Sequence, residues 1–143
     1  MKKVVLLVIL LLLLHLSSCS TNNSYTFMQP FENTERIELI AVSPPPYQTY
    51  RYKEYAALEP IAEIDKTNWD GFRSALQELE CKTYFGDPPT GIYGDAIRIT
   101  YTDGAIELIG VGAGEYYDSE RNAKDRYFYF EQSDYEAFIS KWK

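Results

Sequence analysis

Histidine is nearly absent from this chain of 143 residues, in which His15 is the only one. His15 lies in an apolar stretch near the N-terminus, so a mature chain without that stretch contains no histidine. Ser-His-Asp and Cys-His nucleophilic catalysis both need an imidazole base, and His-ligated zinc needs imidazole ligands. The sequence therefore argues against these mechanisms, and we expect no metal and no cofactor.

Basic residues are few compared with acidic ones. The chain carries 14 Lys and Arg against 21 Asp and Glu, a formal net charge of −7. Residues 1–18 contribute Lys2 and Lys3 and no acid, so the remainder has a charge of −9. A nucleic-acid partner needs a basic footprint, and anionic lipid attracts basic segments. We expect neither partner on grounds of charge, and we interpret the acidic residues as a solvated surface.

The chain has a single long apolar run. Val4 to Leu14 is an unbroken stretch of 11 apolar residues behind Lys2 and Lys3. A transmembrane helix needs about 20 such residues, whereas a basic start and a shorter apolar core are typical of a secretory signal peptide. The small residues of Leu16-Ser17-Ser18-Cys19 then lead directly into a cysteine.

Leu16-Ser17-Ser18-Cys19 resembles the lipobox of bacterial lipoproteins, which reads Leu, two small residues and Cys. The resemblance implies that the Cys19 thiol receives diacylglycerol and that signal peptidase II cleaves before Cys19. It also implies a lipid-anchored protein on the extracytoplasmic face of a cell membrane, inner or outer. Two or more acyl chains give stable anchoring, whereas one does not. An ordinary secretory signal and an uncleaved anchor remain alternatives, and with Cys19 lipidated, Cys81 is the one free thiol.

The rest of the chain is predicted to be one domain behind a tether. Residues 1–18 form the signal peptide, and 19–34 form the lipidated N-terminus and a flexible tether rich in Ser, Thr and Asn. Residues 35–143 then form a single folded domain, large enough to bury a core without disulfides.

A β-hairpin over residues 96–111 organises the predicted fold. Asp103-Gly104 between two alternating apolar runs predicts a two-residue turn. That turn would pair Tyr101 with Ile106 and Ile99 with Leu108, and would place Glu107 on the opposite, polar face.

Two amphipathic helices are predicted by apolar residues at spacings of three and four. They cover about 68–80, with Trp69 and Phe72 in the stripe, and about 134–142, with Tyr135 and Phe138. Further strands are expected at 36–42, 61–64, 81–85 and 127–130, and a charged loop at 115–126. The element order predicts an α+β fold, an antiparallel sheet with both helices on one face.

A tyrosine-rich stretch is the candidate binding surface. Tyr47, Tyr50, Tyr52 and Tyr55 lie among charged residues, and Tyr50 and Tyr52 would share a strand face. Because tyrosine offers an apolar ring and a polar tip, such a surface suits a sugar or a protein partner. Half-buried sheet surface is the alternative interpretation.

Catalysis without histidine would require a pair of carboxylates, as in glycoside hydrolysis. The candidates are Glu107, Glu115, Asp118 and Asp87. With 21 acidic residues in the chain, such a set carries little information. We therefore expect a non-catalytic binding or accessory module that contacts an envelope protein or wall glycan. The alternatives are a carboxylate-dependent cell-wall glycosidase and a wall-glycan-binding module that uses the tyrosine-rich stretch 47–55.

Overall fold

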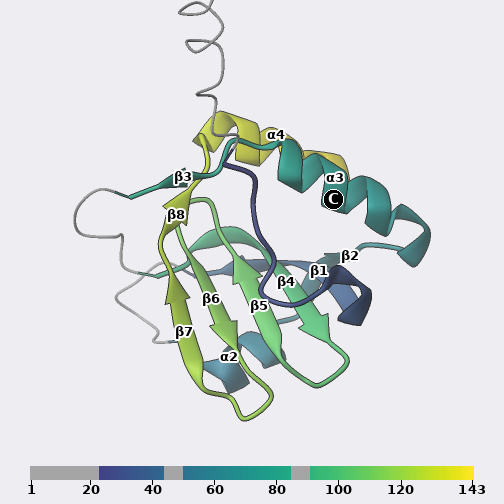
Figure 1. Cartoon of the computed structure of the whole chain (residues 1–143), viewed down its shortest axis with the longest axis vertical. Coiled ribbons are helices and arrows are strands. Elements are labelled where there is room, and N and C mark those ends of the chain that lie inside the picture. The colour runs from purple at the N-terminus through teal and green to yellow at the C-terminus, as the bar shows by residue number, and fades with distance from the viewer. Residues whose placement is uncertain (1–22, 44–49, 85–90) are drawn as a thin grey trace, which may run out of the picture.

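A six-stranded antiparallel sheet forms the centre of the computed structural model, which describes residues 23–43, 50–84 and 91–143 (Figure 1). The strand order is β2-β1-β4-β5-β6-β7. Their bounds are β1 Thr34–Val42, β2 Pro60–Glu63, β4 Gly94–Tyr101, β5 Ile106–Ile109, β6 Gly114–Tyr117 and β7 Ala123–Arg126. A separate two-stranded ribbon pairs β3 (Lys82–Thr83) with β8 (Phe128–Tyr129). The predicted α+β class is confirmed.

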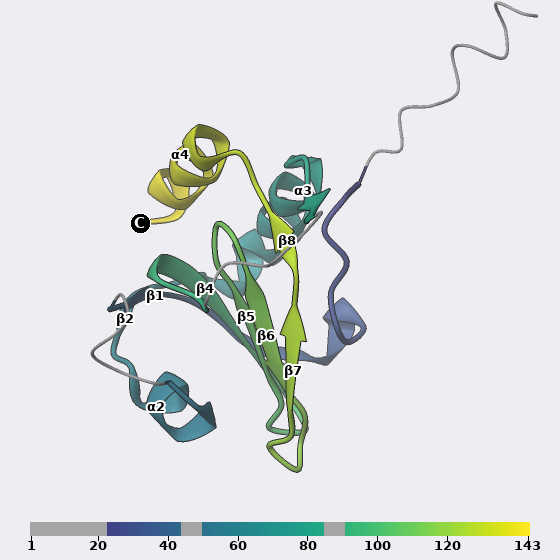
Figure 2. The ribbon, with the colours of Figure 1, turned by 90° about the vertical axis from the view of Figure 1, so that its left-hand side faces the viewer.

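The two predicted helices pack on one face of the sheet, as expected (Figure 2). They are α3 (Trp69–Glu78), which follows the 3-10 turn η2 (Lys66–Asn68), and α4 (Gln132–Trp142). The rings of Phe72 and Phe138 lie 5.2 Å apart where the helices meet. The core below them takes in Ile37, Leu39, Ile97, Ile99 and Ile109 from the sheet.

The opposite face of the sheet is also covered, by a helix that the sequence did not predict. This helix, α2 (Tyr52–Ala57), lies where a strand through Tyr50 and Tyr52 was expected, so that interpretation is wrong. It places Tyr55 on a second apolar cluster. The sheet residues of this cluster include Ile40, Val42, Ala96, Ile106 and Leu108. Central strands buried on both faces lack the alternation that identifies a half-exposed strand.

The central hairpin exists, but its predicted register is wrong by one residue. The turn has three residues, 102–104, because the Tyr101 N–H donates to the Ala105 carbonyl at 2.9 Å. Gly104 has φ +83°, the left-handed conformation that such a turn requires. Consequently Thr100 pairs with Ile106, and Ile99 pairs with Glu107. A one-residue shift turns every side chain of β5 over, so Glu107 faces α3 and α4 and Leu108 faces α2.

Residues 23–33 belong to the folded domain, so the flexible tether predicted through residue 34 is wrong for them. Tyr25 is 1% exposed in the core, and Phe27 and Phe31 pack against it. Phe31–Asn33 form the short 3-10 helix η1, which leads directly into β1. The Ser, Thr and Asn residues of this segment suggested a tether, although three aromatic residues in it pack on the core.

The predicted charged loop at 115–126 is instead the β6–β7 hairpin. Its strands pair Glu115 with Asp125 and Gly114 with Arg126. Strand β7 therefore occupies the sheet edge, and β8 pairs with β3 in the separate ribbon. Edge strands tolerate charged side chains because one side of them faces water.

Candidate functional site

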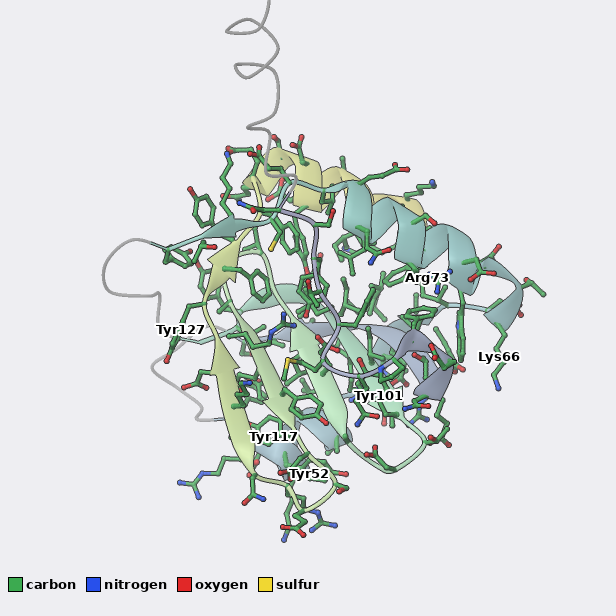
Figure 3. The ribbon with its side chains drawn as sticks, viewed as in Figure 1. Tyr52, Lys66, Arg73, Tyr101, Tyr117 and Tyr127 are labelled. Carbon is green, nitrogen blue, oxygen red and sulfur yellow. The ribbon has the colours of Figure 1, made fainter. Side chains whose placement is uncertain are left out.

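The predicted tyrosine surface and one predicted carboxylate meet between α2 and β6. Tyr50 stacks on Tyr55 at 5.2 Å between ring centroids, and Tyr52 lies 6.0 Å from Tyr117 (Figure 3). Tyr55 is buried, Tyr50 and Tyr52 are half-buried, and Tyr47 lies outside the described residues. The expected open platform is thus a packed cluster with only part of each remaining ring exposed.

A buried arginine holds α2 on the sheet. Arg98 of β4 donates from Nε to Glu38 at 2.8 Å, and from Nη1 to the backbone carbonyls of Tyr55 and Leu58. The last carbonyls of a helix lack the usual partners within the helix. The Tyr55 carbonyl accepts only a long bond of 3.4 Å from the Leu58 N–H, so Arg98 adds a second donor at this helix end. At the other end of α2, the Tyr52 hydroxyl donates to the Gly104 carbonyl at 3.2 Å.

Glu115 lies below this cluster as an acceptor for two tyrosine hydroxyls. Tyr55 donates to one oxygen at 3.2 Å, and Tyr117 donates to the other at 2.7 Å. Burial raises the pKa of Glu115, the two hydroxyl bonds oppose that shift, and the nearby Asp125 carboxylate adds to it. Burial and the Glu115 carboxylate in turn raise the pKa of Tyr55 well above its usual value. The tyrosines therefore stay protonated and remain hydrogen-bond donors.

A hollow of about 500 Å³ opens beside this cluster. It is lined by Arg51, Tyr52, Lys53, Glu54, Tyr117, Arg121 and Ala123. Three cations and one acid surround it, although the whole chain has a net charge of −7. The Arg121 guanidinium lies 4.9 Å from the centre of the Tyr52 ring, and Arg121 has a positive φ of 69°. An aromatic ring beside cations suits a ligand with a flat apolar face and negative charge.

The remaining predicted carboxylates do not join this site. Glu107 lies on the opposite face of the sheet and is fully buried. The Asp118 carboxylate accepts the backbone N–H groups of Asn122 and Glu120. These bonds close the β6–β7 turn and lower the pKa of Asp118. Asp87 lies outside the described residues.

Glu107 forms a buried network that the sequence did not reveal. The hydroxyls of Tyr25 and Tyr101 and the Met28 N–H all donate to its carboxylate. Arg126 pairs with Glu107 at 2.6 Å and also donates to the Thr26 carbonyl. The network fastens residues 25–28 to the sheet. A single acid inside the apolar run of β5 was its only sequence signal.

Two further hollows lie elsewhere. One, of about 460 Å³, separates α4 from the start of β4, where Lys143 pairs with Asp95 at 2.6 Å. The other, of about 330 Å³, lies between residues 23–26 and β3 and includes Cys81. Burial raises the pKa of the Cys81 thiol, so it is protonated and weakly nucleophilic at neutral pH.

Within the described ranges 23–43, 50–84 and 91–143, no helix is long and apolar enough to cross a membrane. Over the same residues, no group of three or more His, Cys, Asp or Glu side chains could hold a metal ion. Cys19, the predicted lipidation site, lies outside them. The chain matched no protein-family model, no curated protein and no solved structure. Its function is therefore inferred from its own residues and their arrangement.

Proposed function

We propose that this chain is a lipid-anchored extracytoplasmic lipoprotein whose domain is a non-catalytic binding module at the cell envelope. The lipobox-like Leu16-Ser17-Ser18-Cys19 supports the anchor. The observation that carries the binding role is the hollow beside α2, where Tyr52 lies between Arg121 and Tyr117. The favoured ligand is a wall glycan that carries negative charge, because sugar faces pack on aromatic rings and the hollow is locally basic.

The carboxylates support binding rather than hydrolysis. General acid–base work needs a carboxyl group within hydrogen-bond reach of the substrate. Both oxygens of Glu115 already accept tyrosine hydroxyls, Glu107 has no exposed surface, and Asp118 closes a turn. These three groups serve the fold.

Co-sedimentation with purified cell wall tests this role, using the full-length protein in detergent. Arg121→Ala and Tyr52→Ala should each weaken retention about fivefold, since an exposed ion pair or an aromatic stacking contact with the ligand contributes about 1 kcal/mol. Lys124→Ala is the matched control, because it removes one exposed charge from the other face of β7. Equal retention of Arg121→Ala and Lys124→Ala would contradict a site at the hollow. If wall retains nothing and envelope extract retains a protein, the glycan assignment is wrong.

A carboxylate-dependent wall glycosidase is the second candidate, favoured by one observation. Glu115 has a raised pKa and lies opposite Asp125, and two carboxyl groups with unequal environments are the usual glycosidase pair. This function requires that the protein release soluble fragments from purified wall and that Glu115→Gln and Asp125→Asn each abolish the release. Absence of release by the parent protein would eliminate it.

A further inference from the structure

The outer side of the β3–β8 ribbon presents a group of tyrosines. In Tyr127-Phe128-Tyr129-Phe130, both phenylalanines are buried in the core, at 6% and 3% exposure, so the alternate tyrosines point outward. Tyr127 is 52% exposed and projects from the edge of the molecule (Figure 3). We name Lys82, Tyr84, Tyr127 and Tyr129 the ribbon face.

Contacts across the ribbon hold the ribbon face together. The rings of Tyr84 and Tyr129 are 4.9 Å apart, and Lys82 Nζ lies 5.9 Å from the Tyr129 ring centre. Lys82 is also near the carboxylates of Glu80 and Glu131, at 3.6 and 3.9 Å. The ribbon face is thus aromatic, with hydroxyl tips and a cation that is already paired.

The ribbon face lies beside the point where the chain joins the domain. The Asn23 carbonyl accepts the Cys81 N–H at 2.8 Å, one residue before β3. The same small hollow is lined by Asn23, Ser24, Thr26 and Tyr127. Only residues 20–22 separate Asn23 from Cys19, and four extended steps of the chain span at most about 14 Å. A lipid on Cys19 would therefore keep this part of the domain within that distance of the bilayer.

We infer that the ribbon face rests in the headgroup region of the membrane that holds the Cys19 lipid. This inference rests on the lipid anchor of the proposed function. Tyrosine is enriched at membrane–water interfaces, because its ring sits among apolar groups while its hydroxyl stays hydrated. Charge attraction is not the cause, since the chain is acidic and Lys82 is paired. The anchor supplies the affinity, and the tyrosines fix the orientation.

With the ribbon face on the bilayer, the position of α2 decides which way the ligand site faces. Helix α2 lies at the end of the molecule opposite the point where residue 23 joins, as Figures 1 and 2 both show. The hollow is lined by residues of α2 and of the β6–β7 hairpin, so it lies at the same end. With the ribbon face on the bilayer, the hollow beside α2 points away from the membrane. The domain then presents its ligand site toward the wall.

Site-directed spin labelling tests the ribbon face in the full-length, lipidated protein reconstituted in phosphatidylcholine vesicles. Single cysteines replace Tyr127 on the ribbon face or Ser119 in the β6–β7 turn, both exposed, in a Cys81→Ser background. The expected result is a several-fold loss of collisions with a water-soluble nickel complex at residue 127, and no loss at residue 119. Tyr84→Ser combined with Tyr129→Ser should restore access at residue 127 while the protein stays with the vesicles.

The outcomes separate this inference from the anchor. If the protein stays with the vesicles and both labels meet nickel equally, the ribbon face does not dock on lipid although the anchor is real. The same result is expected if a protein, rather than lipid, covers that face, and it overturns the inference. If the purified protein carries no lipid and washes off the vesicles, the anchor itself fails and the inference fails with it.

Discussion

Glu107 is a charged residue with no exposed surface, and its side-chain partners come from three separate segments of the chain. Tyr25 lies in the N-terminal segment, Tyr101 ends β4, and Arg126 ends β7. Burial and the Glu107 carboxylate raise the pKa of both tyrosines, so their hydroxyls remain protonated donors. Removal of one partner from such a network leaves the others desolvated and unpaired.

Glu107→Ala should therefore lower the free energy of unfolding by about 3 kcal/mol, the usual cost of breaking a buried ion pair. Urea denaturation of the two proteins measures the difference. The matched control is Glu35→Ala, which removes an exposed glutamate from β1 and should change stability by less than about 0.5 kcal/mol. Similar effects of both substitutions would show that the network does not stabilise the fold.

Glu115 gives the stability a predictable dependence on pH. Because its pKa is higher in the folded than in the unfolded chain, the folded state binds more protons between the two values. The contribution of Glu115 to stability is fully present below the unfolded pKa and is lost as pH rises through the folded pKa. Glu115→Gln has no such loss, so its stability relative to the parent should increase as pH rises above the unfolded glutamate pKa of about 4.

Urea denaturation across that pH range measures the difference. Glu120→Gln exchanges an exposed carboxylate in the same hairpin and should follow the parent at every pH. A difference between Glu115→Gln and the parent that is constant or shrinks with rising pH would contradict the assigned direction.

The segment before β1 acts as an element of the fold although it contains no regular strand. Tyr25, Phe27 and Phe31 form a chain of ring contacts, at 5.4 and 5.1 Å between centroids, across the face that α3 and α4 cover. Arg73 of α3 lies over the Phe31 ring at 5.0 Å. The segment therefore closes the core on that side.

A chain that begins at Thr34 retains every strand but lacks these three rings. Each large apolar side chain stabilises the fold by about 1.5–3 kcal/mol when buried. Relative to a chain that begins at Ser20, we expect a loss of at least about 3 kcal/mol or failure to fold, measured by thermal unfolding with circular dichroism. Equal unfolding midpoints would show that the segment is a tether after all.

The elements that local pattern specifies were predictable, and those that distant contacts specify were not. Helices α3 and α4 carry apolar stripes with period 3.6, and that pattern suffices. The central hairpin was predicted, but its register was not. Both faces of the sheet are apolar here, with Ile99 in one cluster and Ile106 and Leu108 in the other, so either register would bury these side chains. Helix α2 has only six residues, and Arg98, which binds the Tyr55 and Leu58 carbonyls at its C-terminal end, lies 40 or more positions away in the sequence.

The residues of the candidate site were predictable only in part, because distant contacts bring them together. The tyrosine stretch and Glu115 could each be named from the sequence, but the pairing of Tyr55 with Glu115 depends on sheet order. Arg121 was not singled out, because a charged residue in a predicted loop gives no local signal. Its position over Tyr52 arises only when the β6–β7 turn lies beside α2.

The whole molecule has two functional ends in this account. The N-terminal end would join the proposed lipid anchor and carries the ribbon face, and α2 lies at the other end (Figure 2). Residues of α2 line the proposed ligand site. The rigid sheet between them would hold the ligand site at a fixed height above the bilayer. This arrangement depends on the anchor at Cys19.

Intact mass and membrane partition of the protein expressed in a bacterial host, compared with Cys19→Ala and Cys81→Ser, test that claim most directly. We predict that the parent and Cys81→Ser begin at Cys19, carry the added mass of a lipid and sediment with membranes. Cys19→Ala should lose both the lipid and the membrane association. An unmodified parent mass, or a Cys19→Ala protein that still sediments with membranes, would contradict the lipoprotein account and leave a secreted or leader-anchored protein.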